Sequence, residues 1–202
     1  MNQKAAEHLK SVDPVLERLM EKIGPVTIKA RRVPVFHSLV QSIIYQQLNG
    51  KAADTILSRF KSLFGDGHFP SAEQVLARQP EHLRSAGLSR PKASYILGIA
   101  EKAVAGLLPT LKECDKLGDA EIVQRLTEMK GVGRWTVEMF LIFNLGRLDV
   151  LPIHDLGVRR GFQIAYGKRK MPEPEQLERS GEKWRPYRTV AARYLWRAVD
   201  SV

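Results

Sequence analysis

The sequence predicts an all-helical protein, and two observations carry this prediction. Apolar residues recur three and four positions apart in nearly every segment, and no segment shows the convincing alternation of a strand. Helix-start and helix-stop signals bracket these segments, such as Asp13-Pro14 before one and Gly24-Pro25 after it. The length of 202 residues suits one generous domain or two small lobes that share a core.

The next helices follow from local signals in order. Apolar positions from Phe36 onward predict a helix that ends in the turn "YQQLNG", and a second helix runs from that turn to Gly65. Ser71 and Gln74 resemble a capping box, which predicts a short helix that ends near Pro80.

The second half of the chain continues the pattern. A helix is expected after Ser89, and Asp119 is expected to cap the helix that leads into "TEMKGVGRWTVEMF". The segment "YGKRKMPEPEQLERSGEK" predicts a loop containing a short helix, and "WRPYRTVAARYLWRAV" begins the last helix. Residues 26–34 are the only stretch expected to be extended.

Charge is the first feature that bears on function. Lys and Arg number 32 against 22 Asp and Glu, so the formal net charge is +10. Residues 157–202 alone hold eleven basic and five acidic residues. A basic surface is the expected footprint of a polyanionic partner, since each phosphate contact releases condensed counterions. Solubility is the alternative explanation, and charge alone leaves it open.

Composition excludes several classes of protein. Every apolar run is broken within a few residues, so no membrane span is predicted. The first residues, "MNQKAAEHLK", lack the apolar core of a signal peptide. The single cysteine, Cys114, excludes an internal disulfide framework and a four-cysteine iron–sulfur cluster. We therefore expect a cytoplasmic protein, associated with the nucleoid if the source is prokaryotic.

The motif "KGVG" joins two predicted helices and forms a helix–hairpin–helix unit. Gly131 and Gly133 have no Cβ, so a phosphate can meet the backbone N–H groups there. The second helix is expected to begin at about Arg134, where unpaired N–H groups also favour an anion. Lys130 adds positive charge, and no base edge is read, so the anchoring is independent of sequence. A plain turn between packed helices is the alternative.

Asp155 lies in "LDVLPIHDLGVRRGF", twenty-four residues after Gly131, near the start of another predicted helix. Taken alone, this aspartate is best explained as a helix cap, the commonest role of Asp at such a position.

Four ordered blocks together indicate a family: "FHSLVQSIIYQQLNGKAA", "LTEMKGVGRWTVEMFLIF", "LPIHDLGVRRG" and "WRPYRTVAARYLW". The chain resembles the helix–hairpin–helix (HhH-GPD) superfamily of DNA base-excision glycosylases, most closely the DNA-3-methyladenine glycosylase II branch. The resemblance implies a two-lobed helical bundle with the active-site cleft between the lobes. We expect one lobe over about 33–108 and the other over 1–32 plus 109–202, containing the hairpin 127–136. The N-terminal β-domain of some members has no counterpart here.

The resemblance also implies a reaction. Asp155 would be the carboxylate that stabilises the oxocarbenium-like sugar and orients or deprotonates water. No partner acid is evident, which suits a leaving base that is already cationic, such as 3-methyladenine or 7-methylguanine. Trp135 occupies the place where strand-cleaving relatives carry a lysine, so a monofunctional enzyme that leaves an abasic site is expected.

Further roles follow from the same resemblance. The base pocket would contain Trp135, Met139 and Trp196, with an indole face stacked on the cationic base; packing in the core is the alternative for each Trp, and Trp184 is interpreted as structural. The DNA backbone would contact the hairpin residues Lys130, Gly131, Val132, Gly133, Arg134 and Thr136.

Gln47, with Leu48 beside it, would be the wedge that fills the gap left by a flipped nucleotide. A simple helix end stopped by Asn49-Gly50 is equally compatible. The carbonyl groups of Thr127, Met129 and Gly131 would hold a structural monovalent cation, Na⁺ or K⁺. No cofactor is required.

We therefore expect a monomer that acts on damaged bases in double-stranded DNA. The same scaffold excising uracil, hypoxanthine or ethenoadenine is an alternative, and so is a non-catalytic DNA-binding module. His37 and His154 do not form a metal pair by spacing, although His154 can tune the pocket. For Arg159 and Arg160, the sequence leaves two roles open: contact with a DNA phosphate, or an ion pair with an acidic side chain.

Overall fold

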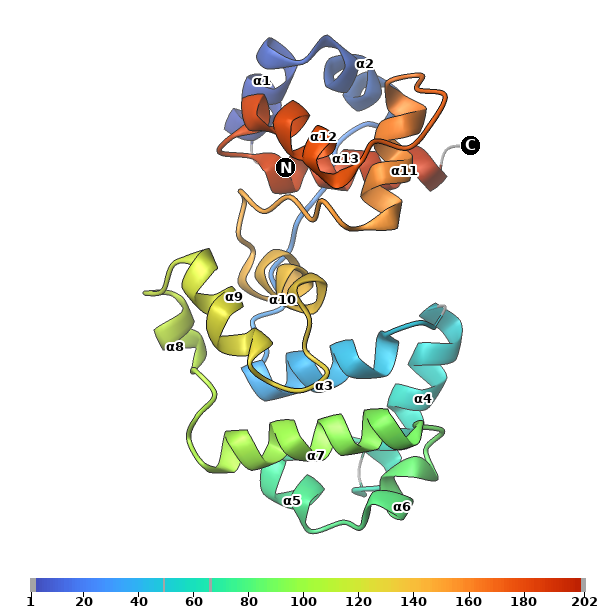
Figure 1. The fold of residues 1–202 in the computed structure, drawn as a ribbon, viewed down its shortest axis with the longest axis vertical. Coiled ribbons are helices and arrows are strands. Elements are labelled where there is room, and N and C mark those ends of the chain that lie inside the picture. The colour runs from blue at the N-terminus through green and yellow to red at the C-terminus, as the bar shows by residue number, and fades with distance from the viewer. Residues whose placement is uncertain (1–2, 49, 66, 201–202) are drawn as a thin grey trace. The chain divides into compact units, whose positions relative to one another are not determined.

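The computed structural model describes residues 3–48, 50–65 and 67–200, and these ranges contain helices but no β-strand (Figure 1). The predicted all-helical fold class is therefore confirmed. The α-helices are α1 (Gln3–Val12), α2 (Pro14–Ile23), α3 (Val35–Tyr45), α4 (Gly50–Ser62), α5 (Ala72–Leu76), α6 (Pro80–Arg84), α7 (Arg90–Val104), α8 (Leu111–Cys114), α9 (Asp119–Thr127), α10 (Arg134–Phe140), α11 (Leu156–Ala165), α12 (Pro174–Gly181) and α13 (Arg188–Asp200). A π-helical turn (Leu141–Leu145) and a 3-10 turn (Glu182–Trp184) complete the set.

Most helix ends lie where the sequence signals put them. The Asp13 carboxylate accepts hydrogen bonds from the first N–H groups of α2, and the capping box of Ser71 is present. Several details differ. The short helix after Ser71 ends at Leu76, Asp119 is the first residue of α9 with Gly118 as its cap, and residues 24–34 are neither helix nor strand. Helix α4 ends at Ser62 and not at Gly65, and the last helix begins at Arg188, because Trp184 lies in the preceding 3-10 turn.

The chain divides into two compact units. Unit 1 comprises residues 1–31 and 141–202, and unit 2 comprises residues 32–140. The boundary expected near residue 108 is thus corrected to 140, and the hairpin belongs with α3–α7. The reason is packing, since α10 lies against both α9 and α3.

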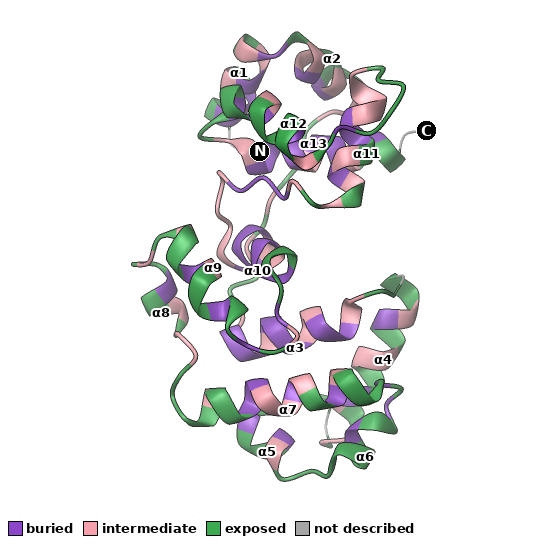
Figure 2. Cartoon of the chain, in the orientation of Figure 1, coloured by how far each residue is buried: buried purple, intermediate pink, exposed green. Residues whose placement is uncertain are grey.

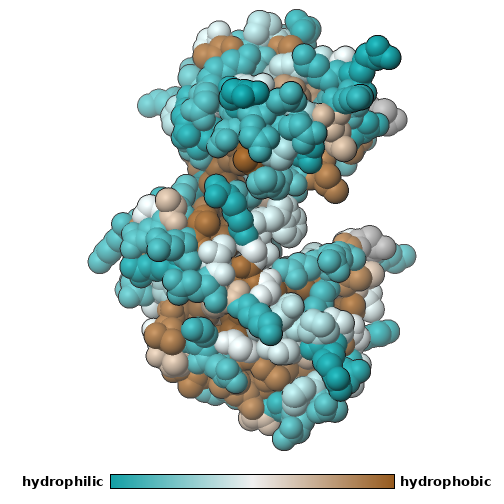
Figure 3. All heavy atoms as spheres, viewed as in Figure 1, coloured by the Kyte–Doolittle hydropathy of each residue, from teal (hydrophilic) through white to brown (hydrophobic). Residues whose placement is uncertain are grey.

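In unit 1, α11 and α13 pack very closely. A Cβ atom added to Gly161 would lie 1.9 Å from the backbone oxygen of Leu195, so only glycine fits at this crossing. Trp184 is fully buried in the same core, as expected of a structural residue, and its indole N–H donates to Asp13 at 2.8 Å. Hydrophilic side chains cover most of the visible surface of this unit in Figure 3.

In unit 2, α3 is the central helix, and it packs against α4, α7 and α10. Buried residues gather along α3, as they do along α13 of unit 1 (Figure 2). None of the helices in the described ranges has the length and apolar character needed to cross a membrane.

Candidate functional site

The two glycines of the hairpin are needed for different reasons. Gly131 has a φ of +87°, and a Cβ there would lie 2.4 Å from the ring of Tyr95 on α7. Gly131 is therefore required by the backbone conformation and by internal packing. Gly133 has an ordinary φ, and an added Cβ would meet no described atom within 4 Å. Only Gly133 leaves bare backbone facing open space.

Burial narrows the predicted contact surface of the hairpin. Lys130, Gly133 and Arg134 are exposed, and the Arg134 guanidinium pairs with Glu138 at 3.0 Å. The side chains of Val132 and Thr136 are buried, so any contact of these two residues with DNA is left to their backbone groups, and the predicted contact stays a prediction. The Thr136 hydroxyl instead accepts a hydrogen bond inside unit 2.

Trp135 is not a core residue. It is the second residue of α10, the second helix of the hairpin, and is 38% exposed, although apolar side chains of this size are usually buried. Met139 follows one turn later on the same face and is half-buried. The pair therefore offers an accessible aromatic and thioether surface beside the hairpin.

The predicted wedge lies in the turn after α3. Gln47 and Leu48 are both exposed, while Asn49 of the alternative helix stop lies outside the described residues. Gln47 has a φ of +58°, a left-handed conformation that is uncommon for a residue other than glycine. Such conformations persist only where the surroundings hold them, and they cluster at functional sites.

Gln46 is a residue that sequence reasoning missed. Its amide donates to the Gly131 carbonyl oxygen at 3.0 Å and to the Thr136 hydroxyl at 3.2 Å. Lys92 of α7 donates to the carbonyl oxygens of Ile44 and Gln46 at 2.9 and 2.7 Å. Desolvation by burial lowers the pKa of the Lys92 ammonium. These partners lie far apart in sequence, so no local pattern signals them.

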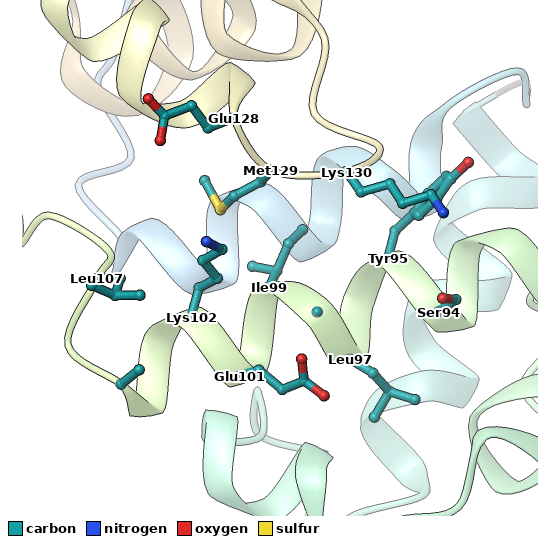
Figure 4. A pocket seen from close by; sticks show the side chains of 12 residues that line it. Ser94, Tyr95, Leu97, Ile99, Glu101, Lys102, Leu107, Glu128, Met129 and Lys130 are labelled. Atoms are coloured by element: carbon teal, nitrogen blue, oxygen red, sulfur yellow. The ribbon is translucent and has the colours of Figure 1, made fainter.

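A groove of about 610 Å³ runs beside the hairpin in unit 2 (Figure 4). One wall is the exposed face of α7, including Tyr95 and Lys102, and the other is formed by residues 128–130. Trp135 and Met139 do not line it, so this groove is not the predicted base pocket.

Asp155 is the N-terminal cap of α11 in unit 1. One carboxylate oxygen, Oδ1, accepts hydrogen bonds from the Val158 backbone N–H and from the Trp196 indole N–H, each at 2.8 Å. The residue is half-buried. Asp155 therefore does cap α11. The hydrogen bond from the Trp196 indole, which capping does not require, fixes the orientation of the Asp155 carboxylate a second time, from a residue far away in the sequence.

Trp196 was expected to line the base pocket. In the structure its indole N–H donates a hydrogen bond to the carboxylate of Asp155. Its ring lies 5.7 Å from that of Phe143, and it is half-buried. Gly157 makes this approach possible, because a Cβ there would lie 2.9 Å from the indole ring. The indole thus fixes the orientation of Asp155.

The remaining candidates divide clearly. Arg159 donates to the Pro172 carbonyl at 2.8 Å and lies near Glu173, so it is used within unit 1. Arg160 is exposed and donates to a glutamine side chain, and His154 is exposed beside Asp155. His37 stacks on Phe69. Among the described residues, no group of three His, Cys, Asp or Glu could hold a metal ion.

The sequence blocks, the hairpin and the capped aspartate define a class of protein. The chain belongs to the HhH-GPD superfamily of base excision DNA repair proteins, whose family model matches residues 40–186. This confirms the resemblance seen in the sequence.

Individual relatives refine the comparison. The chain is 39% identical over 197 residues to DNA-3-methyladenine glycosylase 1 of Schizosaccharomyces pombe, covering 96% of this chain and 86% of that protein. It is 33% identical to the alkylbase DNA glycosidase-like protein mag2 of the same yeast, covering 96% and 92%. The solved structure of S. pombe 3-methyladenine DNA glycosylase in complex with abasic DNA matches with a TM-score of 0.89 at 38% identity, covering 96% of this chain and 95% of that one.

Proposed function

We propose that this protein is a monofunctional DNA glycosylase that flips alkylated purines, of the 3-methyladenine and 7-methylguanine type, out of duplex DNA and hydrolyses their N-glycosidic bonds. The observation that carries the proposal is Asp155, a carboxylate oriented by both a helix N-terminus and an indole N–H. The 39% identity to a DNA-3-methyladenine glycosylase over nearly the whole chain supports it.

The chemistry requires one well-placed negative charge. Cleavage of the N-glycosidic bond develops positive charge near C1′ of the sugar, and the Asp155 carboxylate stabilises that charge and orients or deprotonates the attacking water. A methylated purine is already cationic and leaves as a neutral base, so a second carboxyl group to protonate it is not needed. This differs from glycosidases, which use paired carboxylates.

Trp135 fits both the substrate and the reaction type. Its exposed indole offers a π-face to a cationic purine, and it cannot form the Schiff base through which a lysine would go on to cleave the strand. Product DNA should therefore keep an intact abasic strand until alkali or heat is applied.

Trp135→Ala is expected to lower the release of 7-methylguanine by about 5- to 30-fold, because the cation–π contribution of about 1–2 kcal/mol is lost. The measurement is single-turnover base release. Trp135→Phe keeps an aromatic face and should retain more activity than the alanine variant. Unchanged release by Trp135→Ala would contradict the stacking role.

The hairpin is proposed to hold the DNA backbone through Gly133. Gly133→Ala should fold like wild type, because its Cβ enters open space, yet bind duplex DNA about tenfold or more weakly, since a phosphate loses its approach to the backbone. Gly131→Ala should instead lower the free energy of unfolding by about 1–3 kcal/mol, through the positive φ and the clash with Tyr95. Thermal unfolding and fluorescence anisotropy separate the two. Equal DNA binding by Gly133→Ala and wild type would contradict this role.

A monovalent cation, Na⁺ or K⁺, is proposed to bind the carbonyl oxygens of Thr127, Met129 and Gly131. Two of these already accept hydrogen bonds, Met129 from Val132 at 3.0 Å and Gly131 from Gln46 at 3.0 Å. A carbonyl oxygen has a second lone pair, so these residues fit an ion that shares the oxygens. Bound there, the ion would add positive charge beside a DNA phosphate. We further propose that the protein acts as a monomer and requires no catalytic cofactor.

The proposal is tested by incubating wild type with duplexes of one sequence that carry 7-methylguanine, 3-methyladenine, uracil, hypoxanthine or ethenoadenine. Release of the methylated bases, with an alkali-labile but unbroken strand, is the expected result. If only another lesion is released, the proposal of a DNA glycosylase stands and its proposed substrate is replaced by that lesion. Tight duplex binding without any release would identify a non-catalytic DNA-binding module.

A further inference from the structure

Residues 46–48, the described part of the turn after α3, are here called the wedge turn. The wedge turn and the hairpin are joined within unit 2, although they are far apart in the chain. The Gln46 amide spans the gap, with its two hydrogen bonds ending on the hairpin at Gly131 and Thr136. Its own backbone carbonyl is held from the other side by Lys92. Gln46 is thus the residue through which the turn that carries Gln47 is fastened to the hairpin.

Helix α7 supports both ends of this link. Lys92 and Tyr95 lie three residues apart, so they share one face of α7. Lys92 donates to the carbonyl oxygens of Ile44, in the last turn of α3, and of Gln46, the residue that caps it, where a helix end leaves carbonyl groups without a partner inside the helix. The Tyr95 ring lies against Gly131, where a Cβ would overlap it. The wedge turn and the hairpin are therefore held by one common support.

The conformation of the turn shows why such a link matters. Gln47 has a left-handed φ of +58° and an exposed side chain, in a turn closed by one backbone hydrogen bond from the Leu48 N–H to the Tyr45 carbonyl oxygen at 3.3 Å. The side chain of Gln46, by contrast, makes two hydrogen bonds and is only half-exposed. Gln46 therefore helps to hold the backbone of Gln47, whose exposed side chain has little packing to fix it.

We propose that Gln46 is a positioning residue that couples wedge insertion to backbone anchoring. The proposal rests on the glycosylase function above. Because the Gln46 amide joins the turn to the hairpin, Gln47 has a fixed position relative to the hairpin when the hairpin binds a phosphate. The turn is therefore already ordered before DNA binds. The coupling then adds to affinity only where a gap in the base stack exists for the wedge to enter. Undamaged duplex engages the hairpin alone.

The variant that tests this is Gln46→Met. Methionine has similar length and volume and lacks the amide donors, so packing is largely preserved. Gln124→Met is the matched control, because Gln124 is exposed on α9, the first helix of the hairpin. Gln47→Ala removes the wedge itself, and the double variant Gln46→Met/Gln47→Ala shows whether Gln46 acts through it.

The experiment measures the Kd of each protein for two duplexes of one sequence, one undamaged and one with a single tetrahydrofuran abasic site. Wild type and Gln124→Met should prefer the abasic duplex. Gln46→Met should lose about five- to tenfold of that preference, the effect of one or two hydrogen bonds, while its affinity for undamaged duplex stays within about twofold. In the Gln47→Ala background, Gln46→Met should have little further effect.

Three results would overturn the inference. The first is a Gln46→Met protein with the full preference for abasic DNA. The second is a loss that is equal for both duplexes and accompanied by a lower Tm, which would show that Gln46 only stabilises unit 2. The third is a wild type that binds both duplexes equally and releases no base, which would overturn the proposed function and this inference with it.

Discussion

Asp155→Asn is expected to reduce base release from methylated DNA by about 10²- to 10⁴-fold, with duplex binding retained. Asparagine has the shape of aspartate, and its amide oxygen can still accept the hydrogen bonds from Val158 and Trp196. The fold at the start of α11 is therefore kept, while the negative charge opposite the developing oxocarbenium ion is lost. Single-turnover release of 7-methylguanine measures the effect.

The control for the change in net charge is Asp115→Asn. Removing any carboxylate from a basic protein favours DNA binding, and Asp115 is an exposed carboxylate of unit 2 whose bidentate ion pair with Arg32 becomes an amide hydrogen bond in the asparagine variant. This variant should release base at the wild-type rate. If Asp155→Asn does the same, the carboxylate is only a helix cap and another residue carries the reaction.

The sequence was informative wherever one short segment holds the whole signal. Asp13 followed by proline, and Ser71 with Gln74, predict helix starts because a cap is built from residues within one turn. The hairpin was found for the same reason. By contrast, the sequence could not tell that Gly131 is required by Tyr95 while Gly133 faces open space, because that difference depends on a helix remote in the chain.

The candidate site shows the same limit. Asp155 was identified through a family resemblance, but its orientation depends on Trp196, which is 41 residues away, and Gln46 reaches Gly131 across 85 residues. Neither contact has a spacing that periodicity or capping rules describe. The unit boundary was expected near residue 108 and lies at residue 140 for a related reason, since the packing of α10 on α3 is set by tertiary contacts.

Gly161→Ala is expected to have the largest effect on stability. Its Cβ would lie 1.9 Å from the Leu195 oxygen and 2.5 Å from the Leu195 carbonyl carbon, and both are backbone atoms that cannot rotate away. Helices α11 and α13 must then separate, which costs about 3 kcal/mol and lowers Tm by about 6–12 °C. Thermal unfolding followed by circular dichroism measures this.

The same separation should also impair the reaction, because the two helices carry the two ends of the Asp155–Trp196 hydrogen bond. Gly98→Ala is the control: Gly98 lies inside α7, and an added Cβ would meet no described atom within 4 Å. That variant should gain about 0.5–1 kcal/mol through helix propensity and keep its activity. If Gly161→Ala unfolds at the wild-type temperature, the two helices do not meet at this glycine. If it is destabilised yet releases base at the full rate, the indole N–H is not needed to orient the carboxylate.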